Sequence, residues 1–384
     1  MRQRLIFVLK HNLVLQKLYR ACMSLVFKFL GLFVSIDDNL VLFSSFMGSN
    51  FNDSPRAIYN LICSDPKYST MKCVWAFEHP EEFPDLVTVK IDTPKYFITA
   101  LRAKYWVTNT NIERGLSFKK RRTVYLNTWH GIALKKIGND CPGRKDYNFN
   151  SVDILCVSGD HDENVFFSAF NAKEKSYLKC GMPRNDRLWN SSESERAAMR
   201  QRLGIDAKKK VILYAPTWRD SVNGGKSYDI KPPVDFERWK RELGEEYIVL
   251  FRAHHITTKV LGVKFDDFIM DMSGYSDVND LMIASDVLIT DYSAIAFDYS
   301  ILCRPVVCYA YDYDTYLADR GTYFSIDEKY PSGSCRNEDE LIRKIKNMNF
   351  DEECNRSKEF RDEFVQFGGQ ATKTCIEALF EKEV

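Results

Sequence analysis

Short apolar runs alternate with helical stretches along most of this chain, and the alternation occurs twice. In the first round we expect strands at 40–43, 73–77, 86–91, 105–108, 124–126 and 154–157, with helices at 55–63 and 95–103. In the second round we expect strands at 211–214, 247–252, 287–290 and 305–309, with helices at 278–284 and 293–302. Such alternation is typical of parallel sheets whose strands are joined by crossover helices.

The chain has 384 residues, which is enough for two domains. A charged stretch at 192–210 separates the two rounds, so we predict an α/β protein with two Rossmann-like domains facing a cleft. The expected units are a basic amphipathic segment (1–35), a first domain (36–200) and a second domain (201–384). Residues 351–383 are expected to be helical and to pack back across the domains.

The composition indicates the cellular environment of the protein more clearly than it indicates the function. The formal net charge is +1, which gives no reason to expect a nucleic-acid partner. The 11 cysteines form no Cys-x-x-Cys pair and have no zinc-like spacing. This pattern favours reduced thiols and a cytosolic environment.

The N-terminal 35 residues are basic and apolar, and no acidic residue occurs before Asp37. The basic residues are Arg2, Arg4, Lys10, Lys17, Arg20 and Lys28. They interrupt the apolar runs too often for the ~20 residues that a membrane span requires. We therefore expect an amphipathic helix lying on an anionic membrane surface. The alternative is a core-packing helix with a solvated basic face.

Polar residues follow the predicted strands, where ligands bind to parallel sheets. His130 lies just after the run 124–126, Gly131 permits a turn, and Lys135 and Lys136 follow where a helix could begin. An imidazole beside fixed positive charge suits chemistry on a phosphate. A turn with a hydrogen-bonded histidine is the alternative interpretation.

The second half contributes further candidates at strand ends. Arg252 and His254 could bind phosphate oxygens, and Asp291 or Ser293 could cap a helix whose free N–H groups hold an anion. Asp298, one to two turns into that helix, could accept hydrogen bonds from a ribose. Rigid turns contribute Arg184 and the pair Pro216 and Thr217. Capping, an exposed strand end and a plain turn are the respective alternatives.

No metal site is predicted. The sequence has no His-x-x-x-His, no phosphate-binding GxxxxGK[ST], and its Asp312-Tyr313-Asp314 follows the last strand of the second domain. We therefore expect a transfer reaction that needs neither metal nor cofactor, with arginines, imidazoles and a helix N-terminus supplying positive charge.

Taken in order, these motifs resemble the CDP-glycerol glycerophosphotransferase family of teichoic acid primases and polymerases. The similarity covers roughly residues 40–380. It is carried by Trp129-His130-Gly131 with Leu134-Lys135-Lys136, Gly181-Met182-Pro183-Arg184-Asn185-Asp186, Tyr214-Ala215-Pro216-Thr217-Trp218-Arg219, Arg252-Ala253-His254, Asn279-Asp280-Leu281, the run from Ser285 to Phe297, Arg304-Pro305 and Tyr311-Asp312.

The resemblance implies a GT-B-like fold and a peripheral position on the cytoplasmic face of the cell membrane. It implies transfer of glycerol phosphate from CDP-glycerol to a hydroxyl of a membrane-linked glycan, teichoic acid or capsule acceptor, with release of CMP. It makes His130 the catalytic base and His254 a second catalytic histidine. The substrate-binding residues that we predict are Trp129, Gly131, Arg184, Pro216, Thr217, Arg252, Asp291, Ser293, Ala294 and Asp298.

Two positions depart from the family pattern. Ile132-Ala133 stands where the family often has Thr-Pro, and Ala294 stands where it often has a second serine. Three other functions stay open from the sequence: a CDP-ribitol ribitolphosphotransferase, a GT-B glycosyltransferase using a nucleotide sugar, and a non-catalytic assembly protein at the membrane. The acceptor, the choice between primase and polymerase, and the oligomeric state are also open.

Overall fold

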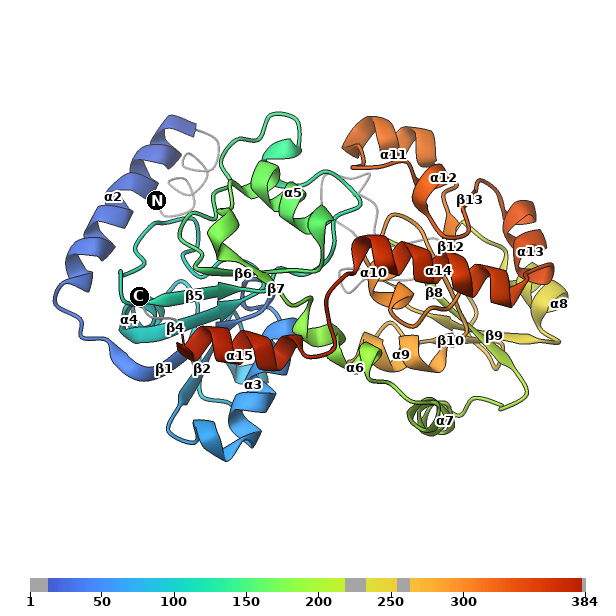
Figure 1. Cartoon of the computed structure of the whole chain (residues 1–384), viewed down its shortest axis with the longest axis horizontal. Helices are drawn as coiled ribbons and strands as arrows, with labels where there is room; N and C mark the ends of the chain where they lie inside the picture. Colours follow the sequence, from blue (N-terminus) through green and yellow to red (C-terminus); the bar gives the residue numbers. More distant parts are fainter. Residues whose placement is uncertain (1–12, 218–232, 254–262, 382–384) are drawn as a thin grey trace.

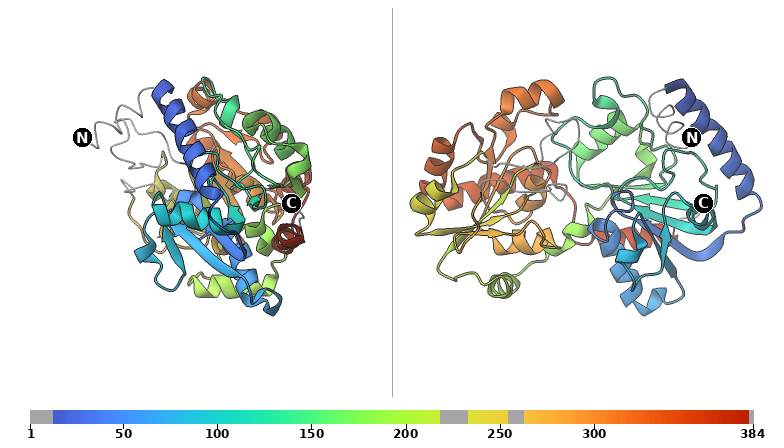
Figure 2. Two further views of the ribbon diagram at one scale, coloured as in Figure 1. Left: turned by 90° about the vertical axis from the view of Figure 1, so that its left-hand side faces the viewer. Right: turned by 180° about the vertical axis from the view of Figure 1, so that it is seen from behind.

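The computed structural model describes residues 13–217, 233–253 and 263–381, and it consists of two α/β halves side by side (Figure 1). Each half is built on one sheet, and helices cover the faces of both sheets (Figure 2). The two sheets confirm the prediction of two Rossmann-like α/β domains.

The first domain has a seven-stranded sheet in the order β3-β2-β1-β4-β5-β6-β7, with every pair parallel. Its strands are mostly apolar because both faces are covered by helices. The elements are β1 (Asp37–Ser44), α3 (Asp53–Ser64), β2 (Lys72–Phe77), β3 (Thr88–Lys90), α4 (Pro94–Arg102), β4 (Ala103–Thr108), β5 (Val124–Asn127), β6 (Ile154–Val157), α5 (Asp160–Phe170) and β7 (Tyr177–Lys179).

The second domain has a six-stranded parallel sheet in the order β10-β9-β8-β11-β12-β13. The elements are β8 (Lys210–Ala215), α8 (Phe236–Leu243), β9 (Tyr247–Phe251), β10 (Ile269–Asp271), α9 (Val278–Ala284), β11 (Val287–Thr290), α10 (Ile295–Ser300), β12 (Val306–Tyr309), α11 (Tyr313–Arg320), α12 (Ile326–Lys329), β13 (Ser334–Cys335), α13 (Glu338–Lys346) and α14 (Phe350–Phe364). Short 3-10 helices, η1 (Phe46–Gly48) to η6 (Pro183–Asn185), lie in first-domain loops and in the linker.

Both sheets reverse their strand order at one point. In the first sheet this point lies between β1 and β4, and in the second it lies between β8 and β11. The chain leaves the two neighbouring strands in opposite directions there, which opens a crevice at their carboxyl ends. The loops that follow β1, β4, β8 and β11 are therefore placed to build a binding site.

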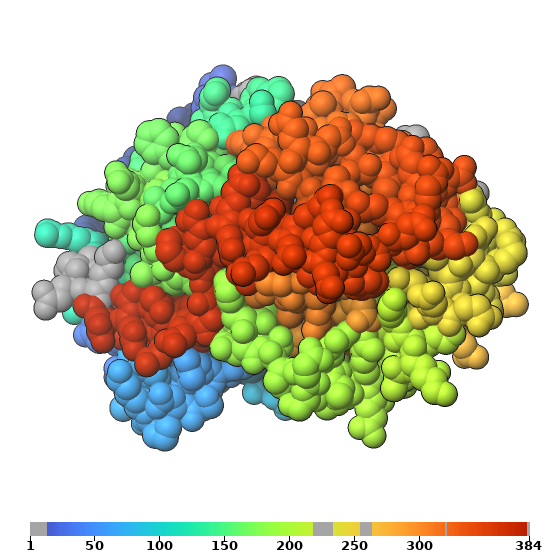
Figure 3. All heavy atoms as spheres, turned by 45° about the vertical axis from the view of Figure 1, so that its right-hand side comes forward, coloured from blue at the N-terminus to red at the C-terminus, as the bar shows by residue number. Residues whose placement is uncertain are grey.

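The chain crosses between the domains twice. It leaves the first domain through α6 (Asp186–Trp189) and α7 (Glu193–Arg202), and it returns through α15 (Ala371–Glu381). Cys375, Ile376 and Leu379 of α15 are buried in the core beneath the first sheet. Figure 3 shows this C-terminal segment, in red, running over both halves.

The helix expected at 351–383 is therefore two helices. The backbone leaves the helical path after Phe364 and passes Trp189 so closely that a Cβ on Gly368 would lie 2.0 Å from the indole Nε1. A side chain at this position would clash with the indole, so only glycine fits here. Val365 is buried, and Asp186 accepts hydrogen bonds from the first backbone N–H groups of α15.

Other element boundaries also differ from the sequence prediction. The helix expected at 293–302 begins only at Ile295 and ends at Ser300, and the strand expected at 86–91 shortens to β3. We did not predict β7, β10 or β13, which are strands of two or three residues at or near the edges of the sheets. Such short strands carry too little period-two pattern to be recognised.

The helix α2 (Leu13–Gly31) lies on the outside of the first domain (Figure 1). Phe27 faces inward and stacks on Phe97 with ring centroids 4.2 Å apart. The rest of the helix surface leaves large apolar side chains exposed: Val14, Leu15, Leu18, Tyr19, Leu25, Val26, Phe29 and Leu30. Within the described ranges, none of the helices combines the length and the apolarity that a membrane span needs.

Candidate active site

The loop after β5 carries His130 to the crevice of the first sheet. Thr128 continues the strand pairing by donating its N–H to the Thr108 carbonyl at 2.9 Å. The Asn127 side chain accepts from the Trp129 N–H at 2.8 Å, which holds Trp129 at a φ of 51°. The Trp129 ring then turns toward the domain core, 4.5 Å from the Phe170 ring centroid. This tight turn leaves His130 at the loop tip, as the sequence predicts.

The His130 ring is held in one tautomer. Its Nδ1 lies 2.7 Å from the backbone carbonyl oxygen of Asn109, in the loop after β4. A carbonyl oxygen can only accept, so Nδ1 must carry the hydrogen and Nε2 keeps a free lone pair in the neutral ring. Burial lowers the pKa of His130, and the charges of Arg184 and Lys135 lower it further against the opposing effects of Asn109 and Asp53. A neutral histidine with an unprotonated Nε2 can act as a general base.

Gly131 brings this loop against the second domain. Its φ is +154°, and a Cβ at this position would lie 2.9 Å from the Cβ of Ala294. The close approach explains why glycine follows His130. It also places His130 beside Ser293 and Ala294, which precede α10.

The stretch after Gly131 does not start a helix, contrary to the sequence prediction. Lys135 instead pairs with Thr322 of the second domain in an isolated antiparallel bridge. Lys136 donates its N–H to the Gly321 carbonyl at 3.2 Å, and Tyr323 donates to the Leu134 carbonyl at 2.8 Å. These bonds satisfy the backbone across the domain boundary, which removes the need for a helix.

Arg184 is the main charged link between the domains. Its guanidinium donates to Asp53 of α3 and to Asp298 of α10, both at 2.8 Å, and all three side chains are nearly buried. Burial alone would lower the pKa of Arg184, but the charges of Asp298 and Asp53 outweigh it and raise that pKa. Asn185 also donates to Asp298, at 2.6 Å. Asp298 therefore serves to hold the linker in place.

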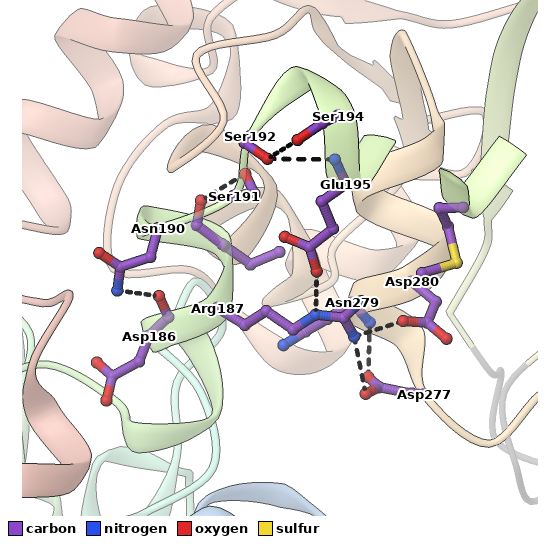
Figure 4. A network of polar contacts seen from close by, with 12 residues as sticks. Asp186, Arg187, Asn190, Ser191, Ser192, Ser194, Glu195, Asp277, Asn279 and Asp280 are labelled. Carbon is purple, nitrogen blue, oxygen red and sulfur yellow. Dashed lines mark hydrogen bonds and ion pairs between the residues drawn. The ribbon is translucent and has the colours of Figure 1, made fainter. Parts of the chain in front are cut away.

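A second network fixes the linker helix α6 to the second domain, and Figure 4 shows it at close range. Arg187 donates to Glu195 of α7 at 2.7 Å and also binds Asp277 and Asp280, at the start of α9. Asn279 donates to the Arg184 carbonyl at 2.6 Å. These contacts hold the linker in a fixed position between the two domains.

A cavity of about 610 Å³ lies between the domains, and the linker forms part of its lining. Six of the predicted site residues line it: His130, Arg184, Arg252, Ser293, Ala294 and Asp298. The first domain also contributes residues that we did not predict, among them Phe46, Asn52, Asp53, Arg56 and Asn60. Their signal in the sequence is the turn 52–54 and the helix after it, which follow the first strand of a Rossmann-like domain, where ligands are usually bound.

The charges around this interdomain cavity balance in number, with four arginines (Arg56, Arg184, Arg187, Arg252) and four aspartates (Asp53, Asp186, Asp277, Asp298). Arg184 and Arg187 are paired with carboxylates. Arg56 and Arg252 have no ion pair with any described residue. Two backbone carbonyls, of Met272 and Tyr275, accept from Arg252 Nη1 at 3.2 and 2.7 Å and orient it.

The remaining predicted site residues lie elsewhere. Asp291 is buried and accepts hydrogen bonds from the Thr217 N–H at 2.9 and 3.1 Å, so the loops after β8 and β11 are tied together at the switch point of the second sheet. Trp129 lies against the first-domain core, and Pro216 precedes the tied Thr217. His254 lies outside the described residues, so its predicted catalytic role stays a prediction.

Within the described part of the chain, one group of three or more potential metal ligands comes together. It consists of the buried thiols Cys156, Cys180 and Cys375, in the core between the first sheet and α15. Cys375 Sγ lies 3.3 Å from Cys156 Sγ and 3.8 Å from Cys180 Sγ. These thiols do not line the interdomain cavity.

Comparison with known proteins identifies the family. Residues 26–381 match the family model described as CDP-Glycerol:Poly(glycerophosphate) glycerophosphotransferase, and the chain belongs to this family. It is 33% identical to a teichoic acid glycerol-phosphate transferase of Staphylococcus aureus, over 89% of this chain and 93% of that protein. It is 31% identical to a teichoic acid poly(glycerol phosphate) polymerase of Bacillus spizizenii, over 97% of this chain and 98% of that protein.

Solved structures agree with the fold. The wall teichoic acid polymerase TagF superposes with a TM-score of 0.80 at 32% identity, over 94% of this chain and 92% of that chain. Its structures include a histidine-to-asparagine variant soaked with CDPG. A UDP-GlcNAc 2-epimerase of Neisseria meningitidis, at 12% identity and a TM-score of 0.53, shares the fold alone.

Proposed function

We propose that this protein transfers glycerol phosphate from CDP-glycerol to a hydroxyl of a membrane-linked acceptor in teichoic acid synthesis, releasing CMP. The observation that carries the proposal is a neutral histidine, held in one tautomer by a carbonyl, at the edge of a cavity that contains two arginines without carboxylate partners among the described residues. The family of the chain supports this donor and this reaction.

In the proposed mechanism, His130 Nε2 removes the proton of the acceptor hydroxyl. The hydroxyl oxygen forms a bond to the phosphorus that carries the glycerol, the bond from that phosphorus to the bridging oxygen breaks, and CMP leaves with the electron pair. Arg252 and Arg56 lie on opposite domains and are suited to bind the diphosphate and the charge that develops on the departing CMP. General-base help from His130 contributes a factor of about 10²–10⁴ in rate.

CDP-ribitol is the closest alternative donor. Relatives named for ribitol phosphate are 27–29% identical over 59–68% of the chain, whereas the glycerol phosphate proteins above match 89–97% of it at 31–33% identity. This difference favours CDP-glycerol.

A donor screen tests the proposal. The protein is incubated with a lipid-linked acceptor and CDP-glycerol, CDP-ribitol or a UDP-sugar, and release of the nucleotide is followed. We expect rapid CMP release from CDP-glycerol only. Preference for a UDP-sugar would contradict the proposal. Independence of metal stays a prediction, and it requires that the same reaction continues in EDTA.

We also propose that α2 holds the protein on the cytoplasmic face of the membrane. At 3.6 residues per turn its exposed apolar side chains fall within about half of the helix circumference, and Lys17 and Lys28 lie beside them. Exposed apolar side chains flanked by lysines suit the interface of an anionic bilayer.

Binding to vesicles containing phosphatidylglycerol tests this second proposal. The Leu25→Asp/Phe29→Asp variant changes two side chains that are 67% and 61% exposed and keeps the inward Phe27, so the fold should survive. Phe167→Asp on α5, 68% exposed, is the matched control. We expect vesicle binding to be lost in the first variant and kept in the control. Equal binding by both would contradict the membrane role of α2.

A further inference from the structure

Three buried cysteine thiols meet at one point in the core between the first sheet and α15. Cys156 lies in β6, Cys180 directly follows β7, and Cys375 lies in α15. The Cys375 Sγ lies 3.3 Å from the Cys156 Sγ and 3.8 Å from the Cys180 Sγ, and all three Sγ atoms lie within 4.8 Å of one another. Three separate elements of the fold therefore bring their thiols together.

The spacing of these thiols fits a bound metal ion. A thiolate sulfur binds zinc at about 2.3 Å, so two sulfurs on one ion lie about 3.8 Å apart in a tetrahedral arrangement and about 4.0 Å apart in a trigonal one. The separation of Cys375 from Cys180 is already 3.8 Å, and its separation from Cys156, 3.3 Å, needs to widen by about 0.5 Å. A small change in one cysteine χ1 angle supplies this distance.

The surroundings of the thiols favour a soft, divalent cation. The apolar cluster that contains the thiols also includes Leu126, Ile154, Ile376 and Leu379, and no described histidine or carboxylate joins the group. Sulfur ligands select zinc or monovalent copper over magnesium and calcium, which prefer oxygen. A divalent ion leaves one net negative charge on three thiolates and a monovalent ion leaves two. Because buried charge is costly, the core favours the divalent ion.

Cys180 loses its proton more easily than an ordinary buried cysteine. The Cys156 and Cys375 thiols can donate hydrogen bonds to its sulfur, and this lowers the pKa of Cys180 although burial opposes the shift. The thiolate is the form of cysteine that binds metal. An entering ion is therefore expected to bind Cys180 first.

We propose that Cys156, Cys180 and Cys375 bind one zinc ion, which fastens α15 to the first domain. Each thiol releases its proton to solvent as its sulfur binds, so three protons leave and the site keeps one net negative charge. The fourth position of a tetrahedral ion remains for an oxygen ligand, and the Gly181 carbonyl oxygen lies beside the site, 3.2 Å from the Cys180 Sγ. Local opening of α15, a helix of 11 residues, admits the ion.

The ion has a structural role in this proposal. None of the three thiols lines the interdomain cavity, so the proposed transfer reaction does not involve the ion. The helix α15 follows the second crossing of the chain between the domains. An ion that holds α15 on the first domain therefore also fixes this crossing.

Metal titration of the reduced protein tests the site. The protein, without a metal-binding tag, is freed of metal and titrated with Zn²⁺ in competition with a chromophoric chelator. Cd²⁺ is titrated in parallel, because its thiolate charge-transfer absorption shows that the ligands are sulfurs. Cys375→Ala removes one thiol of the site, and Cys335→Ala, which is also buried but lies in the core of the second domain, is the matched control.

We expect one equivalent of Zn²⁺ to bind. The affinity should fall at least roughly tenfold in Cys375→Ala, because loss of even an outer-shell partner of a metal site costs about 10–100-fold. At about 100 times its dissociation constant, Zn²⁺ should raise the melting temperature by roughly 5 °C in the unaltered protein and in Cys335→Ala. Absence of saturable binding, or equal affinity in the two variants, would overturn the proposal.

Alkylation of the unaltered protein gives a readout that depends neither on the folding of Cys375→Ala nor on the transfer reaction. In urea below the unfolding transition, where local opening exposes buried thiols, Zn²⁺ should protect Cys156, Cys180 and Cys375 from iodoacetamide. The exposed Cys22 should react equally with and without Zn²⁺. Mass spectrometry of the digested protein measures each thiol. Equal reactivity of the three thiols in both samples, or a disulfide between two of them in the Zn²⁺-loaded protein, would contradict the site.

Discussion

The two cavities that meet at His130 differ in how they are charged. The interdomain cavity has four arginines and four aspartates, and most of these charges are used to hold the protein together. The second cavity, of about 450 Å³, lies within the first domain, and its lining includes His130, Lys135, Lys136 and Arg144. It has three cations and no acid among its described lining residues. The interdomain cavity is therefore organised by its own ion pairs, whereas Lys136 and Arg144 of the second cavity form no ion pair with a described residue.

This difference separates two tasks. Ion pairs across the interdomain cavity fix the spacing of the domains and leave a few unpaired groups to select the donor. The second cavity has no such internal order, so it should recognise charge more than shape. His130 is shared by both, and substitutions around it should reveal which cavity each residue serves.

Replacement of His130 should have the largest effect on turnover. His130→Ala should lower kcat by about 10²–10⁴ because the general base is removed. CDP-glycerol binding should stay close to normal, since the donor is expected to contact the arginines of the interdomain cavity. Calorimetric titration of CDP-glycerol and a CMP-release assay measure the two quantities. A variant that loses donor binding as well would place His130 on the donor side and contradict the separate roles of the two cavities.

Replacement of Arg184 should damage the interdomain cavity as a whole. Arg184→Gln leaves Asp53 and Asp298 buried without their partner, and breaking a buried pair in this way costs about 3–5 kcal/mol in free energy of unfolding. Urea unfolding measures the loss, and donor affinity should fall with it. The control is Arg356→Gln, which removes an exposed pair on α14 worth roughly 0–1 kcal/mol. Similar losses in the two variants would mean that Arg184 does not join the domains.

The sequence predicted the parts of the molecule that depend on local pattern. Alternating apolar runs gave the central strands of both sheets, and His130, Arg252 and Ser293 were found because they follow such strands. What was missed depends on contacts between distant segments. The Asp53–Arg184–Asp298 link joins residues more than 100 positions apart, and the break before α15 follows from the fit of Gly368 against Trp189.

The same distinction explains Asp291. Its position after β11 suggested a helix cap, but its carboxylate ties down the Thr217 N–H on the neighbouring loop. The second cavity was not predicted either, because only the fold of the loop brings Arg144 close to Lys135 and Lys136. Composition and periodicity do not show which distant residues the fold brings together.

Arg56 and Arg252, which have no carboxylate partner among the described residues, test whether the interdomain cavity binds the donor. Arg252→Gln and Arg56→Gln should each weaken CDP-glycerol binding roughly tenfold, since a hydrogen bond to a charged group contributes about 1.5–3 kcal/mol. The KM for the acceptor should change little. Titration of each variant with CDP-glycerol measures the donor, and Arg241→Gln in α8, outside both cavities, is the control. Unchanged donor affinity in both variants would contradict the proposal that the diphosphate binds in this cavity.

The pH dependence should report His130. Protonation removes its free lone pair, so kcat/KM should fall as pH falls through its pKa. Burial lowers that pKa below the ordinary 6.5, so the acid limb should have its midpoint below pH 6.5. Asp162→Asn is the control, because burial raises the pKa of Asp162 to about 7 and its titration could otherwise be mistaken for that of His130. A midpoint above 6.5 that persists in this variant would contradict a buried neutral base.

Ionic strength should give the smallest effect, and it compares the two cavities within one protein. Salt screens exposed charges over a Debye length of about 8–10 Å near physiological ionic strength. Lys136 and Arg144 of the second cavity are exposed cations, so KM for an anionic acceptor should rise with salt. The interdomain cavity has charges of both signs, so the dissociation constant of CDP-glycerol should rise less. Both are measured from 50 mM to 500 mM NaCl, over which the Debye length falls about threefold, with potassium acetate replacing NaCl as the control for specific chloride binding. A donor more sensitive to salt than the acceptor would reverse the assignment of the cavities, because the net charge of each would then fail to predict its ligand.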